Sequence, residues 1–271
     1  MTNAAPTTGE GAFRSLTFEG LRHAYGEGED AVQAVRDLDL HLEAGEFVTV
    51  LGPSGCGKST LFNLASGLAE STPGQVLING EPIAGMNPHT AYMFQHDALL
   101  EWRTVLDNVA LGREFLGMSK KEARADLRDS LADFGLEGFA DRHPAELSGG
   151  MRQRVALMRT YATDRPLLLL DEPFGALDAM TRVRMQEFLL RKWDQDHRTV
   201  LFITHDVDEA ILLGDRLVVL SHRPATVREE IKVDLPRPRR ADQLASDPRY
   251  VELRAHVMSL LHDPVEQGVS A

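Results

Sequence analysis

The chain has 271 residues, of which 43% are hydrophobic, and a formal net charge of −12. This length accommodates one large α/β domain, or one domain with a small appendage, and the hydrophobic content excludes a chain that is disordered throughout. Such an acidic chain disfavours nucleic acid as its main ligand, because nucleic-acid binding usually requires a basic surface. The single cysteine, Cys56, excludes an intrachain disulfide and a multi-cysteine metal cluster.

Membrane-spanning and secretory segments are not expected. The longest aliphatic run, 167–170, is far shorter than the roughly 18 apolar residues that a membrane-spanning helix needs. The first residues also lack the charged, apolar and small-residue regions of a secretory signal. We therefore expect a cytoplasmic protein, whose role at a membrane would come through a partner.

The N-terminal part of the chain is predicted to form strands and turns around one helix. Residues 1–14 have the polar composition of a disordered tail. A helix is expected at 58–68, and strands are expected at 16–21, 32–42, 46–51 and 76–78. The strand at 46–51 leads into a glycine-rich turn, and that turn leads into the helix.

The middle of the chain changes to a helical pattern. Ser119 and Glu122 have the spacing of a capping box, in which each side chain accepts a backbone N–H of the other residue. Before the typical stop signal Gly135, four apolar residues recur on one face of a predicted helix at 123–134: Ala123, Leu127, Leu131 and Phe134. We interpret residues 96–160 as a helical subdomain inserted into an α/β core.

The last part of the chain returns to the alternating pattern of an α/β domain. Two buried parallel strands and a helix that crosses between them are expected, in the order 167–170, 182–193 and 199–203. The domain itself is expected to span 15–222. Residues 223–271 are rich in proline and should form an irregular extension that ends in a short helix at 251–261.

The strongest chemical signal lies between the strand at 46–51 and the helix at 58–68. The segment contains the phosphate-binding pattern G-x-x-x-x-G-K-[ST] and consists of Gly52, Pro53, Ser54, Gly55, Cys56, Gly57, Lys58, Ser59 and Thr60. Its glycines let backbone N–H groups turn toward the phosphates of a nucleotide, and the helix N-terminus adds a favourable dipole. We expect Lys58 to reach the β- and γ-phosphates and the Ser59 hydroxyl to ligate Mg²⁺.

A second signal is an aliphatic strand that ends in two acids, Asp171 and Glu172. The carboxyl ends of the strands in open α/β sheets are where ligands bind. Together with the phosphate loop, this pattern predicts that Asp171 holds Mg²⁺, directly or through water, and that Glu172 orients and deprotonates the attacking water. On its own, the pattern is equally typical of a buried strand that meets solvent.

A third segment, 147–154, distinguishes between the families that share a phosphate loop. Its Ser148 is a good helix N-cap, and Gly149 and Gly150 let the backbone approach an anion, although a plain helix cap looks the same in isolation. The segment resembles the signature of the ATP-binding cassette (ABC) family, whose signature helix faces the γ-phosphate held by the other subunit. The resemblance covers residues 16–222 and implies an α/β fold: a RecA-like P-loop NTPase core with an N-terminal antiparallel β-subdomain and an inserted α-helical subdomain.

The same resemblance implies roles for four further residues. Tyr25 lies where the family stacks an aromatic ring on adenine, and Gln95 matches the glutamine that contacts Mg²⁺ and the attacking water. Asp178 matches an aspartate that communicates across the dimer, and His205 matches the histidine that contacts the γ-phosphate. With ATP as substrate and Mg²⁺ as cofactor, the implied catalytic residues are Lys58, Gln95, Glu172 and His205.

Within the family, the chain resembles the bacterial import ATPases of the nitrate, sulfonate and taurine group at residues 94–102, 106–109 and 235–239. That group also contains relatives that carry pyrimidine thiamine precursors or aromatic carboxylates, so these cargoes stay open. The resemblance implies a homodimer, transmembrane permease subunits and, indirectly, an extracytoplasmic solute-binding protein. The ATPase would be peripheral, on the cytoplasmic face of the membrane. Glu101 departs from the group, which usually has proline there.

Residues 99–102 place large apolar side chains in a loop-like stretch, a composition that suits a docking groove. The resemblance to the ABC family implies that a short permease helix docks there. The alternative is that these residues only anchor the helical subdomain to the core. Two functions of another class are a non-transport P-loop ATPase and a small-molecule P-loop kinase. A DNA-repair cassette would need a long coiled-coil insertion, and a monomeric kinase needs neither the 147–154 segment nor His205.

Overall fold

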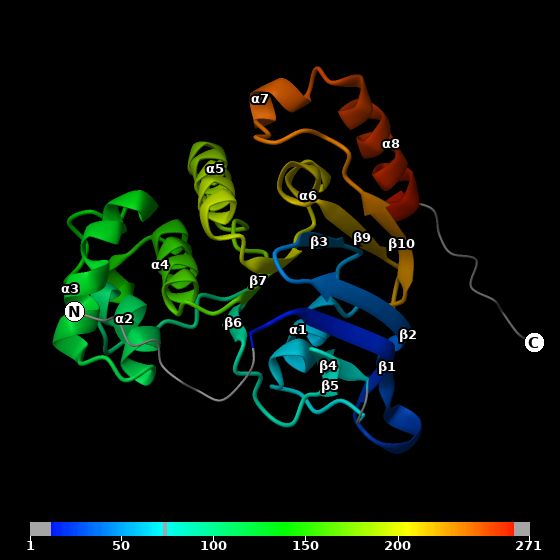
Figure 1. The fold of residues 1–271 in the computed structure, drawn as a ribbon, viewed down its shortest axis with the longest axis horizontal. Helices are drawn as coiled ribbons and strands as arrows, with labels where there is room; N and C mark the ends of the chain where they lie inside the picture. Colours follow the sequence, from blue (N-terminus) through cyan, green and yellow to red (C-terminus); the bar gives the residue numbers. More distant parts are fainter. Residues whose placement is uncertain (1–11, 73–74, 263–271) are drawn as a thin grey trace, which may run out of the picture.

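The computed structural model describes residues 12–72 and 75–262, without the side chain of Glu29. In this part of the chain, the main sheet has the strand order β10-β9-β3-β8-β7-β6, and a second sheet has the order β2-β1-β4-β5 (Figure 1). The strands of the main sheet are β3 (Phe47–Leu51), β6 (Thr90–Met93), β7 (Leu167–Asp171), β8 (Thr199–Ile203), β9 (Arg216–Leu220) and β10 (Val227–Lys232). Neighbours from β9 to β6 pair in parallel, and β10 pairs antiparallel with β9 at one edge.

The central strands are buried on both faces, which explains their continuous apolar sequences. Every residue of β3, β7 and β8 is buried. Alternate side chains enter two cores, as the pleat of a strand requires. Val48 and Val50 pack in a core shared with α1 (Lys58–Ser66) and the second sheet, and Phe47 and Leu51 pack in the core of the opposite face. That second core includes α5 (Ala179–Asp196) and α6 (Val207–Leu213).

The second sheet is antiparallel, as predicted for the N-terminal part of the domain. Its elements are β1 (Ser15–Tyr25), the 3-10 turn η1 (Gly28–Asp30), β2 (Val32–Glu43), β4 (Val76–Ile78) and β5 (Glu81–Pro82). Residues 1–11 of the predicted tail lie outside the described residues. The prediction is wrong for 12–14, because Phe13 is buried and the Arg14 N–H donates to Asn79 Oδ1 at 2.6 Å.

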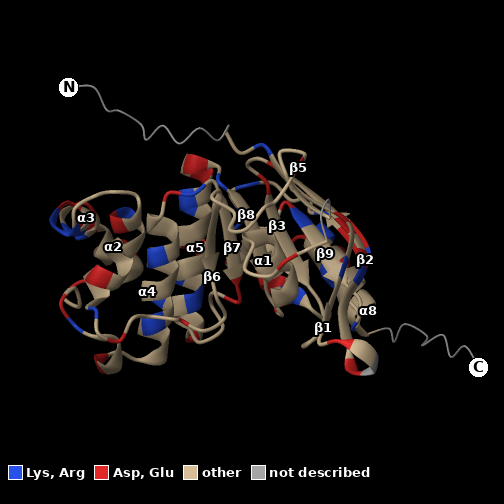
Figure 2. Cartoon of the chain, turned by 90° about the horizontal axis from the view of Figure 1, so that it is seen from below, with Lys and Arg blue, Asp and Glu red and all other residues tan. Residues whose placement is uncertain are grey.

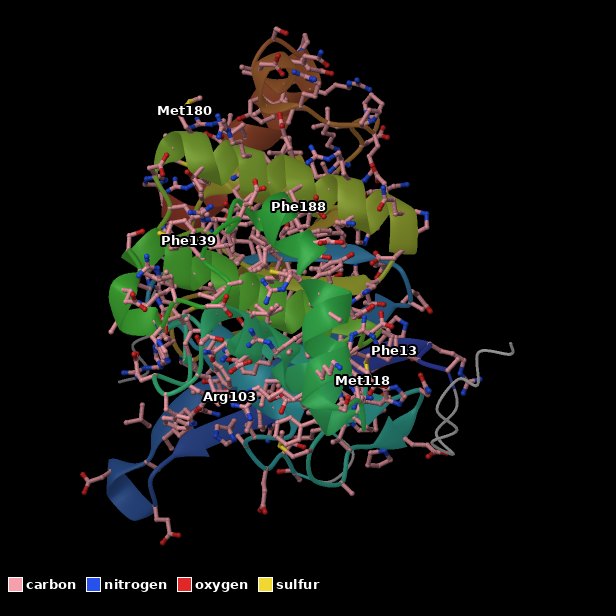
Figure 3. All side chains as sticks on the ribbon, turned by 90° about the vertical axis from the view of Figure 1, so that its left-hand side faces the viewer. Phe13, Arg103, Met118, Phe139, Met180 and Phe188 are labelled. Carbon is pink, nitrogen blue, oxygen red and sulfur yellow. The ribbon has the colours of Figure 1, made fainter. Side chains whose placement is uncertain are left out.

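The predicted helical subdomain forms a group to one side of the sheets, on the left in Figure 1. It consists of α2 (Val105–Phe115), α3 (Lys120–Leu127), α4 (Gly149–Ala162) and the 3-10 turns η2 (Asp129–Phe134) and η3 (Pro144–Glu146). The capping box predicted at Ser119 and Glu122 is present at the start of α3. Phe188 of α5, labelled in Figure 3, packs against the subdomain, and its ring centroid lies 4.5 Å from that of Phe134.

The single helix predicted at 123–134 is wrong, although its apolar face is buried as expected. The helix α3 ends at Leu127, and the chain continues as the 3-10 turn η2 up to Gly135, which has a left-handed backbone with φ +62°. Arg154 donates to the carbonyl oxygens of Phe134 and Gly135 at 2.8 and 2.9 Å. These long-range bonds satisfy carbonyls that a helix end leaves without partners, so the tighter turn costs little.

The helix α4 connects the subdomain to the loop that follows β6. Figure 2 shows its arginines in blue along the helix. Arg159 donates to the carbonyl oxygens of Asp97 and Ala98, both at 2.7 Å, and Arg152 Nε lies 3.0 Å from Asp97 Oδ2. Two arginines of α4 therefore attach this helix to the loop that contains Gln95.

The C-terminal part departs from its prediction. Residues 227–232 were expected to be irregular, but they form β10 and extend the main sheet. This strand is half-exposed and charged, as is common at the edge of a sheet, so its sequence lacks an apolar run. It is followed by α7 (Ala241–Leu244) and α8 (Pro248–His262), which contains the helix predicted at 251–261. Among the described residues, no helix combines the length and apolar character needed to cross a membrane.

Candidate nucleotide site

The phosphate loop lies between β3 and α1, at the carboxyl end of the main sheet. Gly57 has φ +122°, and a Cβ at this position would lie 2.7 Å from the carbonyl oxygen of Ala34. Lys58 is buried, and its Nζ donates to the carbonyl oxygens of Gly52 at 2.7 Å and Pro53 at 2.9 Å. The loop thus folds around its own lysine, and the N-terminus of α1 points into the loop as an anion-binding element.

Asp171 ends β7 beside this loop and accepts a hydrogen bond from Ser59 Oγ at 2.7 Å. Burial raises the pKa of Asp171 and the nearby Glu172 raises it further, whereas the Ser59 bond and the charge of Lys58 lower it. A divalent cation at these oxygens would offset the cost of burying a carboxylate. Carboxylate, hydroxyl and amide oxygens are ligands that Mg²⁺ accepts, so Ser59 and Asp171, with Gln95 on the same cavity, fit the predicted metal.

Glu172 follows Asp171 in a left-handed backbone conformation, with φ +47°, which is uncommon for a residue with a side chain. Its N–H donates to the carbonyl of Ile203 at 3.0 Å, and its carbonyl accepts from Gln153 Nε2 at 3.0 Å. These bonds hold a turn that directs the carboxylate toward His205, whose Nδ1 lies 3.2 Å from Glu172 Oε2. The predicted base and the predicted γ-phosphate contact therefore lie side by side.

A cavity of ≈ 330 Å³, a volume in the usual range for a small-molecule site, connects the phosphate loop, Asp171 and Glu172. It is lined by Tyr25, Ala34, Ser54, Gly55, Gly57, Lys58, Ser59, Thr60, Gln95, Asp171, Glu172 and Arg223. His205 does not line this cavity and lines a separate small hollow beside Glu172. The Tyr25 hydroxyl lies 3.2 Å from Thr60 Oγ1, so the acidic stretch 27–30 that follows Tyr25 does not carry the ring away from the loop. Residues from both sheets thus meet at one cavity.

Some of the predicted contacts do not line this cavity. Gly52 and Pro53 contribute their carbonyls to Lys58. The Cys56 side chain is 1% exposed and packs in the core, where burial raises the pKa of its thiol. For these three residues, contact with a nucleotide stays a prediction that could involve only the backbone.

The signature residues Ser148, Gly149 and Gly150 are not on the cavity wall of the same chain. They start α4, where Ser148 Oγ accepts from the N–H of Met151 at 3.3 Å. Asp178 is also away from the cavity and caps α5, and its carboxylate accepts from the N–H of Thr181 at 3.0 Å. In one chain, the phosphate loop and the signature segment therefore lie at separate places.

Comparison with known proteins decides the family. The profile of the ABC transporter family matches residues 35–175. The chain is 41% identical over 251 residues to the bicarbonate transport ATP-binding protein CmpD of Synechocystis sp., a match that covers 92% of this chain and 89% of the relative. The chain belongs to the ABC transporter family. This cassette is also 40% identical over 241 residues to the taurine import ATP-binding protein TauB of Roseobacter denitrificans, with 88% and 90% of the two chains covered.

A solved structure supports the same conclusion for the fold. It is the dimeric structure of a post-hydrolysis state of the ATP-binding cassette MJ0796 bound to ADP and phosphate. The TM-score is 0.74 at 31% identity, and the match covers 82% of this chain and 100% of the other. The predicted α/β P-loop NTPase fold is confirmed, and the chain is an ABC ATPase.

The sequence motifs of this ABC ATPase did not indicate Arg223, which lines the cavity from the loop between β9 and β10. That loop is attached to β2: the Ala225 N–H donates to the carbonyl of Ala34 at 2.8 Å, and the Arg36 N–H donates to that of Ala225 at 3.0 Å. A signal was available, because β9 is parallel to β3 and must end at the same edge of the sheet as the phosphate loop.

The segment after Gln95 divides between core and surface. Leu99 is buried in the core, as expected of an anchor, whereas Trp102 is 76% exposed. Asn108 holds the loop, because its Oδ1 accepts from the Leu100 N–H at 2.8 Å and its Nδ2 donates to the Leu100 carbonyl at 3.1 Å. The anchor interpretation therefore holds for Leu99, whereas docking of a permease helix at Trp102 stays a prediction.

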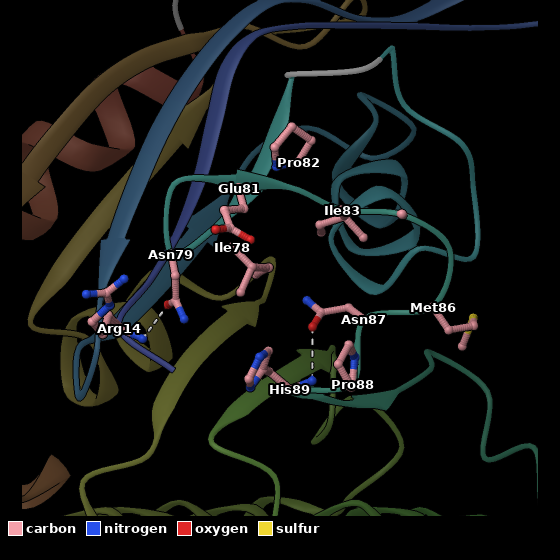
Figure 4. Close-up of a pocket in the computed structure, with 11 residues that line it drawn as sticks. Arg14, Ile78, Asn79, Glu81, Pro82, Ile83, Met86, Asn87, Pro88 and His89 are labelled. Carbon is pink, nitrogen blue, oxygen red and sulfur yellow. Dashed lines mark hydrogen bonds between the residues drawn. The ribbon is translucent and has the colours of Figure 1, made fainter. Parts of the chain in front are cut away.

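A larger cavity of ≈ 580 Å³ lies beside β4 and β5 (Figure 4). Two of its polar side chains already serve the chain itself: Asn79 Oδ1 accepts from the Arg14 N–H at 2.6 Å and Asn87 Oδ1 accepts from the His89 N–H at 3.0 Å. Its lining includes no residue of the phosphate, acidic or signature motifs. Volume alone therefore does not identify the nucleotide site.

Proposed function

We propose that this ABC ATPase energises a bacterial importer, as a homodimer that binds transmembrane permease subunits. The observation that carries the proposal is the convergence of Lys58, Ser59, Asp171 and Glu172 on one cavity, while the signature segment of the same chain lies elsewhere. A second copy of the chain can bring its signature segment to the phosphate site of the first and so complete that site.

The phosphate loop would hold the triphosphate of ATP. Lys58, already oriented by two carbonyl oxygens, directs its charge at the β- and γ-phosphates. Mg²⁺, held by Ser59, Asp171 and Gln95, would neutralise charge that develops on the phosphates. Tyr25 supplies a ring for adenine, and Arg223 adds a second cation to the cavity.

Glu172 would accept the proton of the attacking water. Its left-handed backbone fixes where the carboxylate points, and His205 at 3.2 Å supports that orientation while it contacts the γ-phosphate. A general base that is positioned in this way acts on the water and not on nucleotide affinity. Binding and turnover should therefore respond differently to its loss.

The dimer would place the Ser148 to Gly150 backbone of one chain against the γ-phosphate held by the other. The start of α4 offers N–H groups and a positive dipole end to that anion. Two chains of net charge −12 repel each other without nucleotide, so ATP would act as the link between them. Asp178, at the start of α5, would communicate between the two sites.

The cargo class follows from relatives and not from residues of this chain. CmpD is named for bicarbonate transport and TauB for taurine import, so we infer import of a small solute of the nitrate, sulfonate or taurine kind. A thiamine-precursor pyrimidine or an aromatic carboxylate is the alternative cargo. An extracytoplasmic solute-binding protein would deliver it, and the ATPase would sit on the cytoplasmic face of the membrane through the permease.

The test uses Glu172→Gln and gel filtration with and without Mg²⁺-ATP. We expect a monomer without nucleotide and a dimer with it, ATP affinity close to that of the parent chain, and turnover lower by at least ~10²-fold. Glu137→Gln, an exposed acid of the helical subdomain, is the matched control and should behave like the parent. Normal hydrolysis by Glu172→Gln would remove Glu172 from the mechanism. A monomer with ATP would favour a kinase-like function.

A further inference from the structure

The helix that follows His205 is the link between this residue and the rest of the fold. Asp206 separates His205 from α6 and caps it: Asp206 Oδ1 accepts from the N–H groups of Asp208 at 2.9 Å and Glu209 at 3.1 Å. The backbone at His205 therefore follows the position of α6 for as long as this cap is intact. Figure 1 shows the orange and red C-terminal segment arching over α6.

Arg239 holds the C-terminal end of α6. It is 5% exposed, and its guanidinium donates to the carbonyl oxygens of Ile211, at 3.2 Å, and Gly214. It also donates to the carbonyls of Val233 and Leu235, both at 3.1 Å. Arg239 therefore connects the end of α6 to the segment that follows β10. Burial lowers the pKa of Arg239 to about 10, which leaves it charged at neutral pH.

Arg237 makes a second attachment at the same end. Its Nη2 donates to the carbonyl of Leu213 at 2.7 Å, and its Nε donates to Asp215 Oδ1 at 2.9 Å. Its guanidinium carbon also lies 4.3 Å from the ring centroid of Trp193 in α5. The last carbonyls of α6, which a helix end leaves free, are thus bound by two arginines from outside the helix.

The N-terminal end of α6 is held from α8. Tyr250 donates its hydroxyl to Asp208 Oδ1 at 2.7 Å, and Arg254 Nε donates to the same oxygen at 2.6 Å. Tyr250 is 9% exposed, and burial, followed by the bond to Asp208, raises the pKa of Tyr250 to about 12. The hydroxyl therefore stays a donor at physiological pH. Asp208 is therefore bound through its N–H to the Asp206 cap and through its carboxylate to α8.

We propose that residues 233–254, the C-terminal clamp, position His205 for hydrolysis by fixing both ends of α6. Tyr250 and Arg254 are its positioning residues: they touch neither substrate nor His205 and act through Asp208 and the Asp206 cap. The inference rests on the proposed role of His205 at the γ-phosphate. It gives the C-terminal segment a part in the reaction, although the segment lies outside the nucleotide cavity.

The test separates positioning from plain stabilisation. In the full-length chain, the double variant Tyr250→Phe/Arg254→Ala removes both donors to Asp208 and leaves Arg237 and Arg239 in place. We expect kcat to fall about fivefold while KM for ATP stays within about twofold, because the phosphate loop is unaffected. Arg249→Ala is the matched control, since Arg249 lies on the same helix but pairs with Asp247 at 2.8 Å.

The decisive measurement places the same double variant in a His205→Ala background, with radiolabelled phosphate release to follow slow turnover. If the clamp acts through His205, it causes no further loss there, because coupled residues are not additive. Hydrogen exchange of residues 204–213 gives an independent result: it should be faster in the double variant and unchanged in Arg249→Ala.

Three results would overturn the clamp: an unchanged kcat, the same fold loss in both backgrounds, or unchanged hydrogen exchange at 204–213. If His205→Ala turnover is too slow to measure, the kcat and KM values and the exchange result decide. Failure of the proposed function looks different. In that case the parent chain does not hydrolyse ATP, or His205→Ala turns over at the parent rate, whatever the clamp variants do.

Discussion

The phosphate loop and the signature segment are both proposed to present glycines to a phosphate, and the packing of one chain accounts for Gly57 in the first and Gly150 in the second but not for Gly149. At Gly57, φ is +122° and a Cβ would lie 2.7 Å from a carbonyl oxygen, so the chain itself requires glycine. At Gly149, a Cβ would meet only Arg152 Nη2 at 3.8 Å. Nothing in the packing of its own chain requires the absence of a side chain at Gly149.

The two regions differ in how complete they are. At the phosphate loop, Lys58 and Ser59 are oriented by bonds of 2.7 to 2.9 Å within the chain, and Asp171 is buried against them. The signature segment has a capped helix start that is exposed and faces no phosphate of its own chain. A residue type that the chain's own packing leaves unexplained is therefore a pointer to a partner.

The largest effect is expected at the phosphate loop, from Lys58→Ala. The variant loses the ammonium that faces the phosphates and frees two carbonyl oxygens that the lysine now binds. ATP affinity and hydrolysis should fall together, each by at least ~10²-fold. Titration with a fluorescent ATP analogue measures binding, and exposed Lys121→Ala is the control. Parent-like ATP binding by Lys58→Ala would contradict the role of Lys58 at the phosphates.

The next largest effect is expected at the signature segment, from Gly149→Asp. An acid in the first turn of α4 interacts favourably with the helix dipole, and its Cβ would meet only Arg152 Nη2 at 3.8 Å, so the isolated chain should fold and bind ATP normally. In the dimer the same carboxylate would face the γ-phosphate, and ATPase activity should fall by about 10²-fold with loss of nucleotide-dependent dimers.

Gly149→Ala is the matched control for size without charge, and it should lose far less activity than Gly149→Asp. Thermal melting verifies that both variants fold. If Gly149→Asp hydrolyses ATP at the parent rate, the signature segment does not face a phosphate. If it melts well below the parent, the fold of one chain does require glycine there, and the contrast with Gly57 disappears.

Much of the site followed from the sequence because parallel strands end at one edge of a sheet. Asp171 at the end of β7 and the phosphate loop after β3 come together for that reason. Gln95 follows β6 at the same edge, but it was expected only from the family resemblance. The capping box at Ser119 was equally local, so it was predicted correctly. Patterns of this kind depend on neighbours in the sequence or on one sheet edge.

What escaped prediction depends on distant contacts. The left-handed backbone of Glu172 is held by Ile203 and Gln153, which no local pattern connects to it. The helix at 123–134 tightens into a 3-10 turn where Arg154 binds its last carbonyls. Arg239 is a charged residue in a proline-rich stretch, and its burial could not be anticipated without the carbonyls of α6 that surround it.

The smallest effect, and one seen only with the partner present, is expected from Trp102→Ala. Trp102 is 76% exposed, so its own chain gains little from it, as with Gly149. Its loop keeps its shape through Asn108 and Leu99, and the isolated variant should fold, bind ATP and hydrolyse it like the parent. If a permease helix docks at residues 99–102, removing an exposed aromatic anchor should lower permease-stimulated ATPase and transport by about 10-fold.

The measurement compares the variant with and without its co-purified permease, in detergent and in proteoliposomes. Phe115→Ala is the matched control, because Phe115 is an exposed aromatic of the same subdomain at the far end of α2 and should leave transport unchanged. A Trp102→Ala chain that unfolds alone would make this residue an anchor of its own fold. A variant that transports normally would place the permease contact elsewhere on the surface.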